Sequence, residues 1–353
     1  MFSIIILVAV ILLLVILGLL YRLQVLSSVF SGSYRKQVGG SNKINAALLL
    51  GFLIIGSIAF YWSWRASEDE MLLPVASVHG VETDTFFWIS MIVIGIVFVI
   101  TQVLLFWYAF KYQHTDKRRA YYFPHNNKLE IIWTMIPAVV MALLVFQGWK
   151  TWTKITSAAP AHAEVIEVVG KQFNWMVRYP GPDGKLGVVE NNLIDAVNEF
   201  GIDFNDQNAM DDFTPLEIHV PKGRPVLFKI RARDVLHSVF VPHFRLKMDA
   251  VPGMATKFWF VATKTTAEMQ AETGNPNFKY ELACAEMCGR GHFAMRMIIV
   301  VDEEKDYQKW LAGQKSFASN NPDVVAAAKA RVNKTTAAAT LAPAEETTAQ
   351  AEL

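Results

Sequence analysis

The chain has 353 residues, of which 53% are hydrophobic and only 18% are charged. This composition is too apolar for an ordinary soluble protein and indicates a membrane protein. The formal net charge is only +1, so no overall charge attracts nucleic acid, and we expect no nucleic-acid partner.

Four apolar segments explain the composition. Each is long enough to cross a hydrocarbon core of about 30 Å. A secretory signal peptide is the alternative for the first segment, but it would need basic residues before the apolar core and a small-residue cleavage site after it. The first segment follows Met-Phe-Ser and precedes Tyr-Arg-Leu-Gln, so we interpret it as a membrane anchor. The segments are residues 4–21, 44–62, 86–110 and 129–149.

The loops between these segments predict the orientation in the membrane. Residues 22–43 contain four basic and no acidic residues, and residues 111–128 contain five basic residues and one Asp. In residues 65–85 the balance reverses, with one Arg and five acidic residues. By the positive-inside rule the two basic loops are cytoplasmic. The sequence thus predicts a multi-pass protein of the inner (cytoplasmic) membrane, with everything after residue 149 on the periplasmic or outer side.

After a linker at 150–162 the pattern changes to short apolar strands separated by turn signals. Such spacing predicts an antiparallel sandwich. Residues 187–213 are acidic and rich in Asn, so we interpret them as an insertion. A short helix is expected at 304–311, and the end, rich in Ala, Thr and Glu, is expected to be disordered. The expected strands are 165–179, 216–220, 225–232, 238–241, 257–263, 278–282 and 297–301.

Two thiols, an imidazole and a thioether fall within twelve residues, at Cys284, Cys288, His292 and Met295. Thiolate and thioether are soft ligands and imidazole is borderline, a mixture that selects copper over magnesium, calcium or manganese. The group lies between two apolar, strand-like runs, so we expect it on a loop. His237 lies upstream, in a β-rich segment that can bring its ring to this loop. His162 and His243 have no assigned role and are expected to be solvated.

These residues alone leave several kinds of site open. The two cysteines, which are the only ones in the chain, could form a disulfide in an exported domain. Two Cys and two His could hold tetrahedral zinc, which has no use for a thioether. One Cys, two His and one Met would form a mononuclear blue copper site. Two Cys also allow two copper ions bridged by both sulfurs.

The pattern Cys-x-Glu-x-Cys-x3-His-x2-Met at 284–295, preceded by Asp-Val-Leu-His at 234–237, resembles the signature of subunit II of haem–copper cytochrome c oxidases. The resemblance covers roughly residues 86–302. It implies membrane-spanning helices followed by an antiparallel, Greek-key, cupredoxin-like β-sandwich that holds a dinuclear copper centre, CuA. The first two spans are an extension that the resemblance does not cover.

The resemblance also implies a role for each donor. The two cysteines bridge the coppers, and each histidine caps one of them. The methionine is a weak ligand to one copper, and the backbone carbonyl of the glutamate is a ligand to the other. The glutamate side chain matches a carboxylate that holds a magnesium ion facing subunit I, although it could also be a solvated loop carboxylate. The implied metal ligands are His237, Cys284, Glu286, Cys288, His292 and Met295.

Positions outside the copper motif carry further expectations. Glu130 matches a glutamate at the mouth of the proton pathway called the K channel, while Asn127 and Glu130 also fit a capping-box-like helix start. Phe173 takes the position of the tryptophan through which electrons from cytochrome c enter, and Trp175 of the same patch remains. The docking surface therefore need not suit a standard soluble cytochrome c. Asp234 matches an acidic residue near the donor site.

The implied function is that of the electron-entry subunit of a terminal oxidase. A c-type cytochrome, whether soluble, membrane-bound or fused to another complex, reduces CuA. Electrons then pass to haem in subunit I, where oxygen is reduced to water and protons are pumped. The expected partners are subunits I and III, the cytochrome and the lipid bilayer. No Cys-x-x-Cys-His occurs, so haem is expected only in the partner subunit.

Three other readings share parts of the pattern. A quinol oxidase subunit II has the fold and the spans but lacks the copper ligands. Nitrous oxide reductase lacks the spans, whereas nitric oxide reductase stays open. Copper-storage and assembly proteins generally expose their thiols. The expected division is an extra helix pair (1–64), an outer loop (65–85), a helical hairpin (86–149), the CuA domain (150–302), and a short helix with a disordered tail (303–353).

Overall fold

The computed structural model describes residues 2–115 and 118–341. The chain forms two compact units, and each unit is built from two separate segments of the sequence. One unit comprises Met1–Leu72 and Ile89–Met141, and the other comprises Leu73–Trp88 and Ala142–Leu353. The first is helical, and the second contains the two β-sheets.

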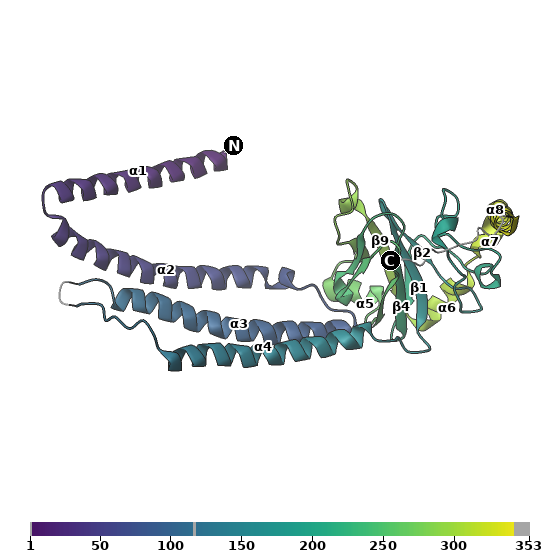
Figure 1. Cartoon of the computed structure of the whole chain (residues 1–353), viewed down its shortest axis with the longest axis horizontal. Coiled ribbons are helices and arrows are strands. Elements are labelled where there is room, and N and C mark those ends of the chain that lie inside the picture. The colour runs from purple at the N-terminus through teal and green to yellow at the C-terminus, as the bar shows by residue number, and fades with distance from the viewer. Residues whose placement is uncertain (1, 116–117, 342–353) are drawn as a thin grey trace, which may run out of the picture. The chain divides into compact units, whose positions relative to one another are not determined.

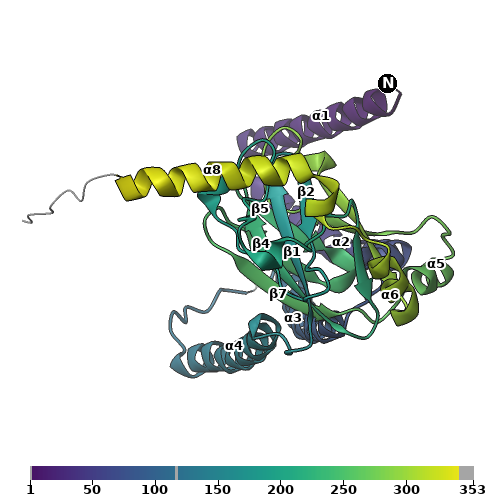
Figure 2. The ribbon, with the colours of Figure 1, turned by 90° about the vertical axis from the view of Figure 1, so that its right-hand side faces the viewer.

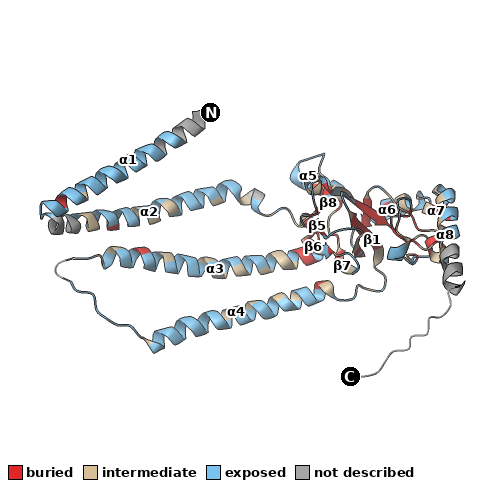
Figure 3. Cartoon of the chain, turned by 45° about the horizontal axis from the view of Figure 1, so that its top comes forward, coloured by how far each residue is buried: buried red, intermediate tan, exposed pale blue. Residues whose placement is uncertain are grey.

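Four long helices carry the apolar segments of the sequence (Figure 1). Each contains a stretch long and apolar enough to cross a membrane, with a mean hydropathy between 2.0 and 2.7. Most of their apolar side chains are exposed (Figure 3), as expected for helices surrounded by lipid. The four predicted spans are therefore confirmed as helices. They are α1 (Phe2–Phe30), α2 (Tyr34–Met71), α3 (Val78–Lys111) and α4 (Asn127–Thr156).

The β-domain is a sandwich of two sheets. One has the strand order β2-β1-β4-β7, and the other has the order β3-β9-β8-β5-β6. Between them lies a core of alternate, inward-facing apolar residues that are almost completely buried, such as Ile166, Phe228 and Leu282. The strands are β1 (Glu164–Lys171), β2 (Asn174–Arg178), β3 (Ile218–Pro221), β4 (Pro225–Ala232), β5 (His237–Val241), β6 (Leu246–Ala250), β7 (Thr256–Val261), β8 (Tyr280–Cys284) and β9 (Arg296–Asp302).

The sheets differ from the prediction in three ways. They are mixed rather than purely antiparallel, because β1 runs parallel to β4 and β3 runs parallel to β9. Parallel neighbours need a long connection, which the intervening strands, loops and helices provide. The strand expected at 165–179 is a hairpin, β1 and β2, that turns at residues 172–173. Strand β6 was not predicted, because its polar Lys247 and Asp249 break the apolar run.

The insertion at 187–213 and the chain end form a second, smaller core beside the sandwich. The short helix expected at 304–311 is confirmed as α6 (Glu304–Ala312). After it, where disorder was expected, the chain forms two further helices, α7 (Phe317–Asn320) and α8 (Pro322–Leu341). Alanine has the highest helix propensity, and burial adds to it here. Figure 2 shows α8 crossing the domain near β2. Residues 342–353 of the expected disordered tail lie outside the described residues. The second core contains Val169, Met176, Phe200, Ile202, Phe204, Ala209, Ala318 and Val325.

Buried charges join the insertion to the sandwich. Arg178 donates from Nε to Glu167 at 2.6 Å and from Nη1 to Asp212 at 2.6 Å, and all three side chains are almost fully buried. Arg231 donates from Nε to the other oxygen of Glu167 at 2.7 Å. We call Glu167, Arg178, Asp212 and Arg231 the charged cluster. Because Asp212 belongs to the insertion and the others to β1, β2 and β4, this cluster ties the two parts together.

The two carboxylates of the charged cluster have opposite pKa shifts. Burial alone would raise the pKa of Glu167, but the two guanidinium groups outweigh it and hold the pKa below its ordinary value. Burial raises the pKa of Asp212 to about 6, although Arg178 opposes the shift. Asp212 also has one oxygen that is buried without a hydrogen-bond partner among the described residues. Its negative charge is therefore the less well compensated of the two.

His243 does not have the solvated position expected of it. Its ring is buried, and Nδ1 lies 2.9 Å from the carbonyl oxygen of Pro74. The ring also makes edge contacts with Phe278 and Tyr280. It is a packed structural histidine, whereas His162 is exposed as predicted.

Candidate metal centre

Strand pairing brings the upstream histidine to the cysteine loop. Strand β5 begins at His237 and pairs with β8, which ends at Cys284, in a register that places Val239 opposite Cys284. The amide of Ala285 then donates to the carbonyl oxygen of Ser238 at 3.0 Å and extends the pairing toward His237. The start of β5 and the end of β8 therefore lie side by side at the same edge of the sheet.

The six expected donor atoms lie together at this edge. The sulfurs of the two cysteines are 3.9 Å apart. Nδ1 of His237 lies 3.9 Å from Sγ of Cys284, and the carbonyl oxygen of Glu286 lies 3.2 Å from the same sulfur. Nδ1 of His292 and Sδ of the methionine lie 3.6 Å and 3.9 Å from Sγ of Cys288. We call this group the donor cluster; its members are His237, Cys284, Glu286, Cys288, His292 and Met295.

The loop that joins β8 to β9 is closed by its own backbone. The amide of Cys284 donates to the carbonyl oxygen of Met295 at 3.2 Å, which brings the two ends of the loop together. Gly289 has a φ of 131°, a backbone conformation that residues other than glycine rarely adopt. A Cβ atom at Gly291 would lie 2.5 Å from the side chain of Phe173. The loop therefore needs glycine at both positions, and Phe173 packs against them.

The donor cluster is largely shielded from solvent. His237, Met295 and Cys288 are 0%, 1% and 4% exposed, while Cys284 and His292 are half-buried. Burial, with a smaller contribution from Cys284, raises the pKa of the Cys288 thiol to about 11. A cation bound here must therefore displace a proton from this sulfur.

The chemistry of the donor cluster fits copper better than the alternatives. Both cysteines are free, and their sulfurs are much farther apart than the roughly 2.05 Å of a disulfide. One imidazole nitrogen and both sulfurs lie within 4.8 Å of one another, so that a single ion can contact all three. The thioether beside Cys288 is a soft ligand that suits copper and has no place in a structural zinc site. The residues present therefore fit a copper centre.

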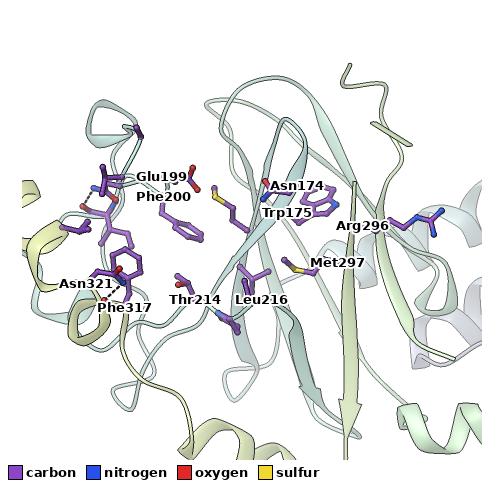
Figure 4. Close-up of a pocket in the computed structure, with 18 residues that line it drawn as sticks. Asn174, Trp175, Glu199, Phe200, Thr214, Leu216, Arg296, Met297, Phe317 and Asn321 are labelled. Atoms are coloured by element: carbon purple, nitrogen blue, oxygen red, sulfur yellow. Dashed lines mark hydrogen bonds between the residues drawn. The ribbon is translucent and has the colours of Figure 1, made fainter. Parts of the chain in front are cut away.

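The aromatic residues expected at the electron entry lie next to the donor cluster. Phe173 is 40% exposed and covers the glycines of the β8–β9 loop. Trp175 is only 3% exposed, and the centre of its ring lies 6.0 Å from that of His237. Trp175 and Asn174 also line a cavity of about 620 Å³ between β2, the insertion and helices α7 and α8 (Figure 4).

The two expected glutamates have different surroundings. The carbonyl oxygen of Glu286 faces the donor cluster, whereas its side chain is exposed. Glu130 lies in the first turn of α4, also exposed. The helix start involves Asn126 rather than the predicted Asn127. The side-chain oxygen of Asn126 accepts from the backbone amide of Leu129 at 3.1 Å. The backbone amide of Asn126 donates to the carboxylate of Glu130 at 3.2 Å.

Two residues contact the donor cluster without offering it a ligand atom. Asp234 accepts from Nε2 of His237 at 2.8 Å and from the amide of Gln172 at 2.7 Å. The side chain of Gln172 donates to the carbonyl oxygen of Cys288 at 2.7 Å. Burial would raise the pKa of Asp234, but these hydrogen bonds outweigh it and lower the pKa. The sequence showed an acid three residues before the histidine, but it could not show that its two carboxylate oxygens accept hydrogen bonds from His237 and Gln172.

Four helices able to cross a membrane, followed by a cupredoxin-like sandwich with soft donors on its β8–β9 loop, define a membrane-anchored cupredoxin. Two family descriptions match the chain: "Cytochrome C oxidase subunit II, transmembrane domain" over residues 70–151 and "Cytochrome C oxidase subunit II, periplasmic domain" over residues 164–303. The chain belongs to the cytochrome c oxidase subunit II family. The chain is thus a subunit of an oxidoreductase complex, a membrane protein with a periplasmic domain.

Two curated relatives agree with this assignment. "Alternative cytochrome c oxidase subunit 2" of Bradyrhizobium diazoefficiens is 34% identical over 281 residues, which cover 77% of this chain and 92% of that protein. "Probable cytochrome c oxidase subunit 2" of Rickettsia bellii is 26% identical over 284 residues, which cover 78% of this chain and 95% of that protein. A solved periplasmic domain of subunit II of cytochrome oxidase from Bradyrhizobium japonicum is 25% identical and covers 45% of this chain and 95% of that one, with a TM-score of 0.30.

Proposed function

We propose that the chain is the electron-entry subunit of a terminal cytochrome c oxidase and that the donor cluster holds the dinuclear copper centre CuA. The observation that carries the proposal is the pair of free thiols 3.9 Å apart, with an imidazole Nδ1 beside each sulfur. Two sulfurs so placed can bridge two ions, and each histidine can then complete the coordination of one. A mononuclear site would leave part of this donor set unused.

The chain's own residues explain why such a site suits electron transfer. A copper pair bound there supplies a one-electron carrier whose charge is shared between two ions. His237 is fixed by the β5–β8 pairing, and Cys284 by its bond to the other end of the loop. Met295 is buried against Cys288. Ligands held in this way move little when the charge changes, so little rearrangement opposes each transfer.

Phe173 and Trp175 provide the entry region of the proposed path. A donor that docks over the half-exposed ring of Phe173 lies beside the β8–β9 loop, which carries four of the side-chain donors. Trp175 forms a second aromatic contact with the donor cluster through the ring of His237. We assign the donor to the c-type cytochromes, and the acceptor to haem in subunit I, where oxygen is reduced.

Two carboxylates extend the proposal beyond electron transfer. Glu130 is an exposed acid at the start of a helix that can cross the membrane, which suits a proton entrance of the K-channel type. The exposed side chain of Glu286 is available to a magnesium ion shared with subunit I, because only its carbonyl oxygen faces the donor cluster. In this proposal the complex lies in the inner membrane, pumps protons and also contains subunit III.

Electron paramagnetic resonance of the full chain tests the assignment. The chain would be purified in detergent, loaded with copper and analysed for copper content. We expect two coppers per chain and a multi-line spectrum from one unpaired electron shared by two nuclei. A four-line mononuclear spectrum, a site that holds only zinc, or a Cys284–Cys288 disulfide after loading under reducing conditions would overturn the proposal.

A further inference from the structure

The donor cluster draws on separate pieces of chain. His237 is the first residue of β5, directly after the turn at residues 233–236, and the other donors lie from the last residue of β8 to the start of β9. A third turn, at residues 172–173 between β1 and β2, lies against both of them. The relative positions of these three loops decide the distances between the donor atoms.

Asp234 connects the first loop to the third and also holds the histidine ring. One carboxylate oxygen accepts from Nε2 of His237 at 2.8 Å and from the amide of Val235 at 2.7 Å. The other oxygen accepts from the amide of Gln172 at 2.7 Å. A Cβ atom at Gly170 would lie only 2.8 Å from Cδ2 of the His237 ring. The ring therefore lies in close contact with both Gly170 and Asp234.

The bond to Asp234 also selects which ring nitrogen can bind a metal. An ionised carboxylate only accepts hydrogen bonds, so Nε2 of His237 carries the proton. In a neutral imidazole this leaves the lone pair on Nδ1, the atom that faces Sγ of Cys284 at 3.9 Å. Carboxylates that orient metal-binding histidines in this way are a recurring feature of metal sites.

Gln172 completes the connection to the cysteine loop. Its side-chain amide donates to the carbonyl oxygen of Cys288 at 2.7 Å, while its backbone amide donates to Asp234. One residue thus joins the turn before β5 to the loop between β8 and β9. The connection passes through two hydrogen bonds and uses no donor atom of the cluster.

We propose that Asp234 and Gln172 are positioning residues that lock the three loops together and orient His237 for metal binding. This inference rests on the proposed function. It differs from the role that the sequence resemblance implies for Asp234, which is an acidic residue near the donor site. Asp234 is partly exposed, but each of its carboxylate oxygens accepts a hydrogen bond from its own chain, which is the arrangement that a positioning residue requires.

The test compares Asp234→Asn with the unchanged full chain in detergent. Asparagine keeps the shape but loses one acceptor and the negative charge. We expect copper affinity, measured by competition with a chelator, to fall by about 10- to 100-fold, the usual range for a residue that supports a ligand. The copper hyperfine pattern should change as well. Glu272→Gln is the matched control, because it removes an exposed carboxylate whose partner among the described residues is Lys264.

A second pair of variants tests the connection between the loops. Gln172→Ala removes the bond to Cys288 but keeps the backbone amide that donates to Asp234, so we expect a smaller loss of copper affinity. In the double variant the losses should not add, because both residues act on the same loop arrangement. Hydrogen exchange of the amides of Gln172 and Val235 in the copper-free chain gives a readout that needs no metal. We expect faster exchange at both positions in Asp234→Asn.

The outcomes separate this inference from the proposed function. An unchanged chain that binds no copper would contradict the proposed function, while the exchange measurement would still judge the connection. An unchanged chain that binds copper, with Asp234→Asn showing normal affinity, spectrum and amide exchange but weaker, salt-dependent reduction by a cytochrome, would overturn the positioning role. That result would make Asp234 a docking charge.

Discussion

The donor cluster and the charged cluster are both buried in the β-domain, but different interactions hold them. The donor cluster contains two sulfurs of cysteine, a thioether, two imidazoles and a backbone carbonyl, which strand pairing and one loop bring together. The charged cluster contains two carboxylates and two guanidinium groups that bond directly to one another. One is positioned by its surroundings, and the other is itself the connection between two parts of the fold.

This difference separates function from stability within one domain. Cys288 and Met295 belong to the core between the sheets, but removal of one donor leaves the many other core side chains and the strand pairing in place. Removal of a partner from the charged cluster leaves a buried charge without compensation, which is costly. We therefore expect changes at the first to alter metal binding with little effect on stability, and changes at the second to do the reverse.

The largest expected effect is that of Cys288→Ala. It removes one of the two sulfurs proposed to bridge the coppers, so copper affinity should fall by more than about 100-fold, beyond the range seen for residues that merely support a ligand. Copper content and the resonance spectrum measure this loss. The control is Met269→Leu, a change at another buried sulfur in the same core that should leave copper binding intact. Near-ultraviolet circular dichroism should show an unchanged fold in both variants, and a lost fold in Cys288→Ala would contradict the separation.

Arg178→Met tests the other side of the comparison. It leaves Asp212 without a cationic partner and Glu167 with only Arg231, so we expect the free energy of unfolding to fall by about 3–5 kcal/mol. Denaturant titration of the full chain in detergent measures it. Arg224→Met, at partly exposed ion pairs with Glu164 and Glu304 that are far less buried than the charged cluster, should cost less than about 1 kcal/mol. An equal loss of unfolding free energy in the two variants would show that burial does not make the charged cluster more important for stability.

A smaller effect should appear in the pH dependence of stability. The pKa of Asp212 is raised to about 6 in the folded chain, so between about pH 4 and pH 6 the folded state keeps a proton that the unfolded state releases. Stability from this group is therefore present at low pH and is lost as the pH rises through that window, by up to about 3 kcal/mol. Asp212→Asn should remove this part of the dependence. An identical pH profile in the variant and the unchanged chain would refute the assignment.

Much of the fold could be predicted because its signals are local. The four spans are continuous apolar runs, and strands such as β4 and β9 are short apolar runs between turn signals. The misses have physical causes. The parallel pairs depend on which distant strands meet, and this is not visible in a local pattern. Strand β6 was missed because Lys247 and Asp249 interrupt its apolar residues. Helices α7 and α8 were missed because composition alone cannot show that Ala318 and Val325 are buried in the second core.

The candidate site could be predicted in part for the same reason. Cys284, Cys288, His292 and Met295 lie within twelve residues, so their spacing indicates that they meet in one place, although the residues alone left the kind of site open. The charged cluster could not be predicted, because its members are separated by up to 64 positions and become partners only after folding. The same holds for Gln172, whose partners lie 62 and 116 positions away.

The crowding of donors into one short loop has a consequence for how such domains can diversify. All donors except His237 lie between the end of β8 and the start of β9, so one stretch of twelve residues determines which metal the domain can hold. Exchange or shortening of that stretch would alter or abolish metal preference while both sheets, their core and the membrane helices stay as they are. A lineage could therefore give up its metal and keep the scaffold through a change confined to one small part of the gene.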